Sequence, residues 1–474
     1  MKILMKKILT ALFLLSCCVS CTNDFESINT NRDEPTQVAG NLLLPTVIFD
    51  LANLSVGETY GFGEIISQYG ASYEYNQLDI YNWTSDARFW GLYRILQNVK
   101  DIKNYGLAND LPNYEAVGLI LEAYCYSILA DAYGDVPYAE SNRAEEGIIA
   151  PAYDSQESIY NGLLAALEEA NSIIDTDSGI EGDRLYGGDM MKWKKWGNAL
   201  HLRLLMRISE VRNVSADLQK IVDGPDTYPL FESNDEEAIY HYSGINPDIS
   251  PVSVGVGREY EYYLGIPTTH LVNTLLKNDD PRINEWLDEK VNDDGSLEFI
   301  GVDPGQNLGD IGRPDAFCRK DESYFSDPAK INAVFLSYSE QAFILAEAAE
   351  RDMINGDAKN YYETAVAASF EQWGVAMPAD FLTDKAPYEA GNLGRIYEQK
   401  WLALYHSGVE SWFDWKRTGQ PAFIQAGPGN VNNGRVPVRL MYPSLEQSVN
   451  AANYQDASAR IGGDNINSRV WWDK

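Results

Sequence analysis

The chain has 474 residues with 45% apolar and 23% charged side chains, a composition typical of a globular protein with a large core. Its formal net charge is −33 at pH 7, and so acidic a surface repels phosphate backbones, which argues against nucleic acid as a partner. The same charge argues against electrostatic attachment to anionic lipid.

Residues 1–20 have the features of a secretory signal peptide. Lys2, Lys6 and Lys7 give a positive start, and the apolar run from residue 8 to residue 15 is far shorter than the roughly 20 residues that a membrane-spanning helix needs. Removal of this segment leaves 34 basic and 70 acidic side chains, a net charge of −36.

Cysteines lie where the signal peptide ends. In bacterial lipoproteins a small residue precedes the cleavage site and the cysteine after it receives lipid; Ser16 or Ser20 would supply that residue before Cys17 or Cys21. Because one acyl chain gives only marginal membrane binding, stable anchoring needs a multiply acylated cysteine. The residues alone leave the choice between Cys17 and Cys21 open.

Apolar residues spaced three and four apart predict several amphipathic helices. These helices cover 114–133, 159–174, 193–208, 341–354, 358–373 and 393–404. Asp189 is a predicted N-cap, Ser337 and Glu340 fit a capping box, and Asp357 can cap the helix that follows the break at Gly356. The helices on either side of that break should form an antiparallel pair.

The predicted fold is mainly α. Helix pairs rich in alanine and aromatic residues indicate tetratricopeptide-like units in a curved stack, although no strict repeat of about 34 residues is present. Long loops over 57–85, 223–266, 291–330 and 419–474 are expected to carry function or a few short strands. Composition does not divide the chain further, so we expect a flexible tether over 21–40 and one domain over 41–474.

Motifs typical of enzymes and metal sites are missing from the sequence. It contains no GxGxxG, no phosphate-loop Gly-Lys, no GxSxG and no HExxH. Its four histidines are scattered, and nothing marks a glycosidase pair among seventy acidic residues. Cys125 and Cys318 have no histidine at ligand spacing, and the CxxC over 18–21 lacks a strand-helix context. We expect binding without catalysis, cofactor or metal.

Seven stretches together resemble the SusD/RagB family of nutrient-binding outer-membrane lipoproteins, in particular its SusD-like second subgroup. They are "CTNDFESINTNRDEPTQV" from residue 21, "ILADAYGDVPYAE" (128–140), "WKKWGNALHLRLLMRIS" (193–209), "DDPRI" (279–283), "GVESWFDWKRTGQP" (408–421), "VPVRLMYPSLEQSVNAANY" (436–454) and "VWWD" (470–473). Arg32 stands where the family usually has proline. The stretches span nearly the whole mature chain in the family's order.

The resemblance implies a helical tetratricopeptide-like fold and lipidation at Cys21. It also implies a location on the outer membrane, facing the exterior of a Gram-negative bacterium. The expected partner is a SusC-like TonB-dependent transporter, to which the family delivers captured oligosaccharides, or peptides in some branches, without chemistry. A peptide-capturing member, a glycoside hydrolase on a helical scaffold and a scaffold for protein partners are the alternatives.

The quoted motifs themselves are interpreted as scaffold. Gly134 and Pro137 suit a tight turn in which Asp131 and Asp135 can bond backbone amides. The residues of the "WFDWKR" segment, Trp412, Trp415, Lys416 and Arg417, suit amphipathic packing and internal ion pairing.

Aromatic residues in loops are the candidate ligand contacts, because flat rings beside polar groups suit sugars. Aromatic side chains on the apolar faces of the predicted helices, such as Trp193, Trp196 and Trp401, are expected in the core. Two loops remain, "SYEYNQLDIYNW" (72–83) and "GREYEYYLG" (257–265), which supply Tyr73, Tyr75, Asp79, Tyr81 and Trp83, and Arg258, Tyr260 and Tyr262. A β-hairpin with aromatics packed on the helices is the competing interpretation of both loops.

Overall fold

The computed structural model describes residues 38–256 and 260–473. The predicted signal peptide, Cys21 and the predicted tether up to residue 37 lie outside the described residues. Ala39–Lys474 forms one compact unit by itself.

Helices dominate the described residues, which contain 17 α-helices and only short strands, so the predicted mainly α class is confirmed. The first helices are α3 (Gly40–Glu58), α4 (Glu64–Ile66), α5 (Leu92–Asn109), α6 (Pro112–Tyr133), α7 (Gln156–Ile173), α8 (Met190–Arg207) and α9 (Ser215–Asp223). The others are α10 (Tyr260–Leu264), α11 (Thr269–Lys277), α12 (Ile283–Trp286), α13 (Glu322–Ser326), α14 (Tyr338–Glu350), α15 (Ala358–Gln372), α16 (Leu393–Ala403), α17 (Glu410–Thr418), α18 (Glu446–Val449) and α19 (Ala451–Arg460).

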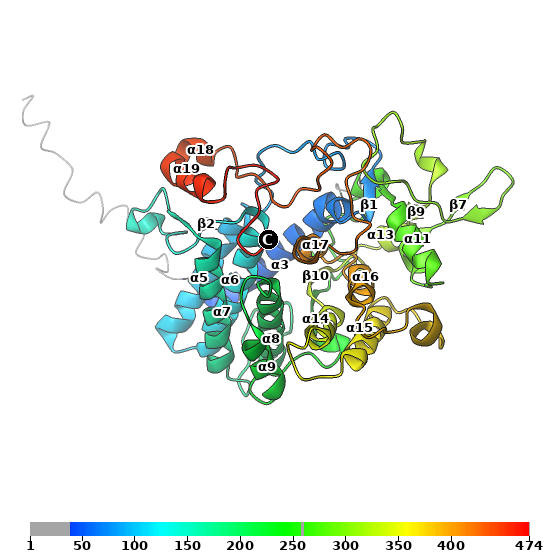
Figure 1. Ribbon diagram of the computed structural model, residues 1–474. Coiled ribbons are helices and arrows are strands. Elements are labelled where there is room, and N and C mark those ends of the chain that lie inside the picture. Colours follow the sequence, from blue (N-terminus) through cyan, green and yellow to red (C-terminus); the bar gives the residue numbers. More distant parts are fainter. Residues whose placement is uncertain (1–37, 257–259, 474) are drawn as a thin grey trace, which may run out of the picture. The chain divides into compact units, whose positions relative to one another are not determined.

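Consecutive helices pack side by side, as tetratricopeptide-like pairs do (Figure 1). Helix α5 packs on α6, α6 on α7 and α7 on α8, and α14 packs on α15 and α16. Helix α8 also contacts α14, which joins the two sets. The predicted helix pair on either side of Gly356 is confirmed as α14 and α15.

The predicted helix caps are present in the structure. Asp189 accepts hydrogen bonds from Met191 N and Lys192 N, Asp357 accepts one from Asn360 N, and Ser337 accepts one from Glu340 N. In a capping box the Glu340 side chain would also bond the main-chain N–H of Ser337. This second half of the prediction is wrong, because the Glu340 carboxylate is buried and pairs with Arg203 at 2.6 Å. The long-range ion pair replaces the local contact.

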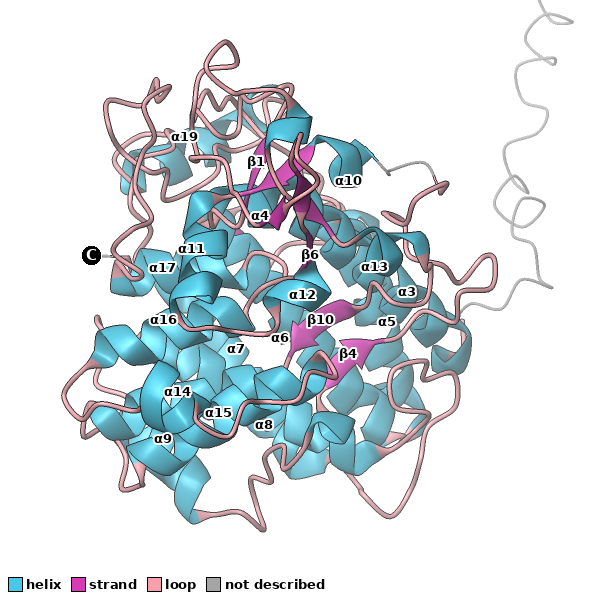
Figure 2. Ribbon diagram, turned by 90° about the vertical axis from the view of Figure 1, so that its right-hand side faces the viewer, coloured by secondary structure: helices cyan, strands magenta, loops and turns pink. Residues whose placement is uncertain are grey.

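The predicted loops contain short antiparallel ladders that join distant parts of the chain. β1 (Gly70–Ser72) pairs with β5 (Gly265–Pro267), and β4 (Ala238–Tyr240) pairs with β10 (Ala333–Leu336). In Figure 2, β1 lies near α4 and the β4–β10 ladder lies below α12. The other ladders join β2 (Val136–Pro137) to β3 (Tyr153–Asp154), β6 (Leu287–Asp288) to β9 (Arg319–Lys320) and β7 (Lys290–Val291) to β8 (Leu297–Glu298).

The core is rich in aromatic rings from the helices. Trp193 and Trp196 are fully buried and Trp401 is 3% exposed, so their assignment to the core is confirmed. Gly40–Ile66 and Pro112–Tyr133 are long and apolar enough to cross a membrane, by length and composition only. The second stretch is buried inside the fold, as a core helix is.

Four of the stretches that carry the family resemblance meet at the buried Asp131 carboxylate. Trp472 Nε1 donates to its Oδ1 at 2.7 Å, Arg207 pairs with its Oδ2 at 3.2 Å, and Lys416 Nζ donates to its main-chain oxygen at 2.6 Å. Asp131 therefore binds side chains from distant segments, which corrects the prediction that it caps amides of its own turn. Gly134 adopts φ 89°, a conformation that favours glycine at this turn.

The predicted internal ion pairing of the "WFDWKR" segment is present. Arg417 binds both oxygens of Glu347 at 2.6 Å, and the two side chains are almost fully buried. Trp412 is fully buried and donates from Nε1 to Pro437 O. These residues stabilise the fold and face no surface site.

Candidate functional site

The two loops selected from the sequence lie next to each other. The β1–β5 ladder places Gly70 opposite Pro267 and Ser72 opposite Gly265, and Tyr73 N donates to Leu264 O at 2.8 Å just beyond it. The ladder lies at the ends of the two loops, which contribute Ser72 and Gly265 to it, and residues 260–264 of the second loop form helix α10. The ladder joins one loop to the other, so the predicted β-hairpin within each loop is wrong for the described residues. Arg258 and the side chain of Tyr260 lie outside the described part of the chain.

Several of the predicted contact residues are buried by the protein itself. Asp79 is 5% exposed and accepts a hydrogen bond from Ser72 N at 3.0 Å, and burial raises the pKa of its carboxyl to about 7. Tyr81 is 3% exposed and its hydroxyl accepts from Gln68 Nε2. Tyr262 is buried against Phe325. Ligand contact by these three side chains stays a prediction.

The remaining rings of the first loop differ sharply in exposure. Trp83 is half-buried, packs against Phe62 and Trp412, and donates from Nε1 to Leu78 O at 3.1 Å. Tyr73 is half-buried beside β1. Tyr75, in contrast, is 78% exposed and holds its backbone at φ 55°. A left-handed backbone is uncommon for tyrosine, and such strain occurs often at binding sites.

Tyr75 lines an open pocket of about 280 Å³, which we name the β1–β5 pocket. Its other lining residues include Glu58, Tyr60, Glu64 and Arg88 from the α3–α5 region and Leu264 from the second loop. Arg88 pairs with Glu58 at 2.8 Å, and Glu64 pairs with Lys320 at 2.5 Å beneath the surface. The pocket thus offers a ring, carboxylates and a guanidinium, the mixture that polyhydroxylated ligands need.

Gly70 lets strand β1 lie close to helix α4 at the β1–β5 pocket. A Cβ at this position would lie 2.8 Å from Glu64 Oε1, closer than a carbon and an oxygen can approach without displacement. Any larger residue would require the Glu64 side chain or β1 to shift. A glycine that no motif identifies therefore lets β1 and the Glu64 carboxylate lie this close at the pocket.

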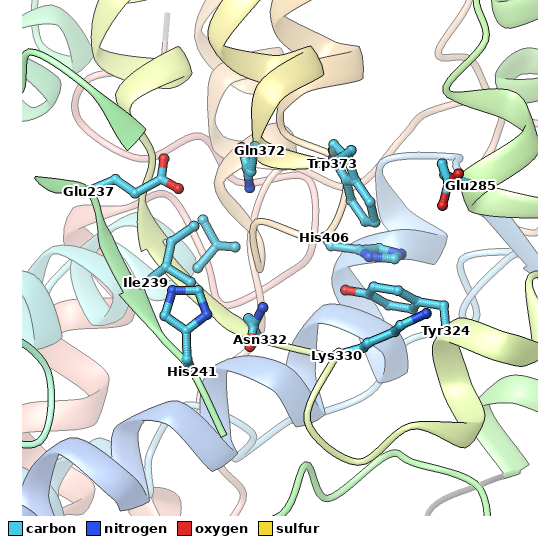
Figure 3. A pocket seen from close by; sticks show the side chains of 11 residues that line it. Glu237, Ile239, His241, Glu285, Tyr324, Lys330, Asn332, Gln372, Trp373 and His406 are labelled. Carbon is cyan, nitrogen blue, oxygen red and sulfur yellow. The ribbon is translucent and has the colours of Figure 1, made fainter. Parts of the chain in front are cut away.

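A second cavity of about 240 Å³ lies beside strands β4 and β10, and we name it the β4–β10 pocket. Figure 3 shows Glu237, Gln372 and His241 on one side and the rings of Trp373, His406 and Tyr324 on the other. Burial and then the charge of Lys320 hold the pKa of His406 well below its usual range, so this ring is neutral. The sequence analysis missed this pocket, since its residues share no motif or helical stripe.

No group of three or more His, Cys, Asp and Glu side chains that could hold a metal ion occurs within 38–256 and 260–473. Cys125 and Cys318 are buried and free. The described residues therefore form a mainly helical protein of tetratricopeptide type, in which the β1–β5 and β4–β10 pockets are lined by polar and aromatic side chains.

The comparisons give the family. The SusD-like family 2 model, described as "Starch-binding associating with outer membrane", matches residues 31–443, so the chain belongs to this family. The structural search returns solved SusD homologues, and the resemblance found in the sequence is confirmed. No curated protein matches the chain.

Solved structures share the fold over nearly their whole length. An outer-membrane protein from Bacteroides vulgatus associated with nutrient binding is 26% identical to this chain, with a TM-score of 0.81. The match covers 92% of this chain and 100% of the other chain. A chitin-binding protein is 28% identical, with coverage of 92% and 99% and a TM-score of 0.79. A SusD homologue from Bacteroides fragilis is 24% identical, with coverage of 92% and 100% and a TM-score of 0.81.

Proposed function

We propose that this protein is a cell-surface lipoprotein that captures oligosaccharides at the β1–β5 pocket and delivers them to a SusC-like TonB-dependent transporter, without catalysis. The observation that carries the proposal is Tyr75, whose ring is 78% exposed at a pocket that also contains carboxylates and the guanidinium of Arg88. Membership of a family described as starch-binding supports the ligand class.

Stacking and hydrogen bonding together set the expected affinity. A ring stacked on the C–H face of a sugar adds about 0.5–1.5 kcal/mol beyond the area that it buries. Hydroxyl groups of the sugar can donate to Glu58 and Glu74 and accept from Arg88, all of which line the pocket. One or two rings with a few such contacts correspond to dissociation constants in the millimolar to micromolar range, about 4–8 kcal/mol.

Chitin oligosaccharides are the first ligands to test. One similar protein of known structure, 28% identical to this chain, binds chitin, whereas the family description refers to starch. Titration with chitin and starch oligosaccharides of equal length therefore distinguishes two sugars that differ in the N-acetyl group and in the configuration of the glycosidic bond. A basic or neutral peptide in the same titration tests the peptide-capturing alternative.

We expect Tyr75→Ala to weaken binding of the cognate oligosaccharide at least several-fold, because the variant removes the exposed stacking ring. The melting temperature should change little, since most of the Tyr75 side chain is exposed. Isothermal titration calorimetry measures the affinity. Ile149→Ala, at another exposed side chain (85%), is the control and should bind as the parent does.

Trp83→Ala is the matched packing variant. Because Trp83 packs against Phe62 and Trp412, this variant should melt at a lower temperature. Unchanged affinity in Tyr75→Ala would place the glycan site elsewhere. Release of reducing ends from the bound oligosaccharide would contradict the absence of catalysis.

Membrane extraction tests the anchor and the partner together. Cys21→Ala should release a soluble, folded protein, whereas Cys17→Ala should stay with the membrane, because we place the acyl chains on residue 21. The anchored parent should co-purify in mild detergent with a TonB-dependent channel through an interface above about 2,000 Å². Acyl mass on residue 17, or repeated recovery of the lipoprotein alone, would count against the proposal.

A further inference from the structure

The β4–β10 pocket contains a buried carboxylate without a counter-ion. Glu237 is 9% exposed and lines this pocket, where its Oε2 accepts a hydrogen bond from Tyr338 N at 3.0 Å. No ion pair of Glu237 occurs among the residues that the structure describes. Burial, and then the nearby Glu371 and Asp235, raise the pKa of the Glu237 carboxyl to about 8. At pH 7 this carboxyl therefore holds its proton most of the time, and a positive ligand that binds beside it would displace the proton and leave the carboxylate charged.

Other polar atoms that line the same pocket also lack partners. Gln372 Oε1, Trp373 Nε1 and His406 Nε2 are buried and make no hydrogen bond within the described chain. The other nitrogen of His406, Nδ1, forms a hydrogen bond with Tyr60 OH at 2.9 Å, so Nε2 is the ring nitrogen that can contact a ligand in the pocket. A ligand with hydrogen-bond donors would satisfy the Gln372 oxygen, whereas the Trp373 indole N–H is itself a donor and is not satisfied by such a ligand.

The arrangement of charges and rings selects the class of ligand. Two carboxyl groups, Glu237 and Glu285, line the pocket together with Lys330 and two histidines, His241 and His406, whose pKa values burial lowers. Figure 3 shows Lys330 beside Tyr324, on the side away from Glu237. A protonated primary amine brings three donors and no acceptor, which suits the carboxylates and the amide oxygen of Gln372. The neighbouring aromatic rings attract a cation through their faces.

We propose that the β4–β10 pocket is a second binding site, which takes a small protonated primary amine with Glu237 as its counter-ion. The rings of Trp373 and Tyr324, whose centroids lie 5.4 Å apart, form the opposite wall together with His406. This site is distinct from the β1–β5 pocket. It requires no oligosaccharide.

Calorimetric titration with propylammonium chloride tests the site, with 1-propanol as the uncharged ligand of similar size and sodium chloride to keep ionic strength constant. The parent should bind the ammonium ion and not the alcohol. Glu237→Gln should weaken binding at least tenfold, because the amide keeps the shape and cannot ionise when the ammonium ion binds. Glu371→Gln removes the same charge from an exposed neighbour that does not line the pocket, and should bind within about twofold of the parent, since exposed charges are screened.

A second variant keeps the test decisive where Glu237→Gln affects folding. Glu285→Gln removes an exposed carboxylate of the pocket and should weaken binding several-fold without changing the melting temperature. The proposal is overturned where the ammonium ion binds no better than the alcohol, or where Glu237→Gln and Glu285→Gln both bind as the parent does; where Glu237→Gln does not fold, parent-like binding by Glu285→Gln alone overturns it. Equal losses in the Glu237 and Glu371 variants would also overturn it, because they would reveal a general charge effect.

Discussion

Asp131→Ala should lower the free energy of unfolding by about 3–5 kcal/mol, the range measured when one partner of a buried ion pair is removed. The variant leaves the Trp472 indole N–H and the Tyr160 hydroxyl, which donate to Asp131 Oδ1 at 2.7 and 2.5 Å, without an acceptor. Arg207 loses one of its two carboxylates and keeps Glu410. Equilibrium urea unfolding, followed by far-UV circular dichroism, measures the loss.

Asp226→Ala is the matched control, because Asp226 is exposed and surface substitutions usually change stability by less than about 0.5 kcal/mol. A loss below about 1 kcal/mol in Asp131→Ala would show that the cluster is not part of the cooperative core. The result would then contradict the interpretation of the shared family motifs as scaffold.

Lys416 should make the stability of the protein rise with pH between about 7 and 9.5. Burial lowers the pKa of its ammonium group to about 7, whereas the unfolded chain binds the proton up to the ordinary lysine value of 10.5. Across this window the unfolded state holds more protons, so the free energy of unfolding increases with pH, by about 2–3 kcal/mol in total.

Lys416→Met removes this gain and keeps a side chain of similar length beneath Trp412 and Trp472. Urea midpoints of parent and variant at a series of pH values from 7 to 9.5 give the comparison. The difference between the two proteins isolates Lys416, because all other titrating groups are shared. Parallel curves would show that Lys416 keeps its proton in the folded state, through the neighbouring Asp473 and Asp131.

Helices with one apolar face were predictable, because burial of that face requires apolar residues at every third or fourth position of the sequence. The stripe from Ile159 to Ile174 corresponds to α7, and the stripe from Trp193 to Ile208 to α8. Helix α5 has the same kind of stripe, with Ile95, Val99 and Ile102 buried, and could have been found in this way. Helix α3 contains Pro45 and is apolar around most of its surface, so it offers neither a face nor a clear boundary.

The candidate site was predictable only in part. Composition identified the aromatic loop 72–83, but the exposed Tyr75 and the buried Tyr81 have similar neighbours in the sequence and both have positive φ. Tertiary packing alone separates them, since Tyr81 meets Gln68 and Trp83. The β4–β10 pocket combines residues from positions 237 to 406, which no local pattern can bring together.

The short β1–β5 ladder ties two surface loops, nearly two hundred positions apart, into one structural unit. Its main-chain bonds require residues 70–72 and 265–267 to keep their register, whatever side chains the flanking segments carry. Either loop of this chain can therefore be exchanged for that of a relative while the ladder stays intact, provided that residues 70–72 and 265–267 are kept. The ladder marks the boundary at which such a graft should be joined.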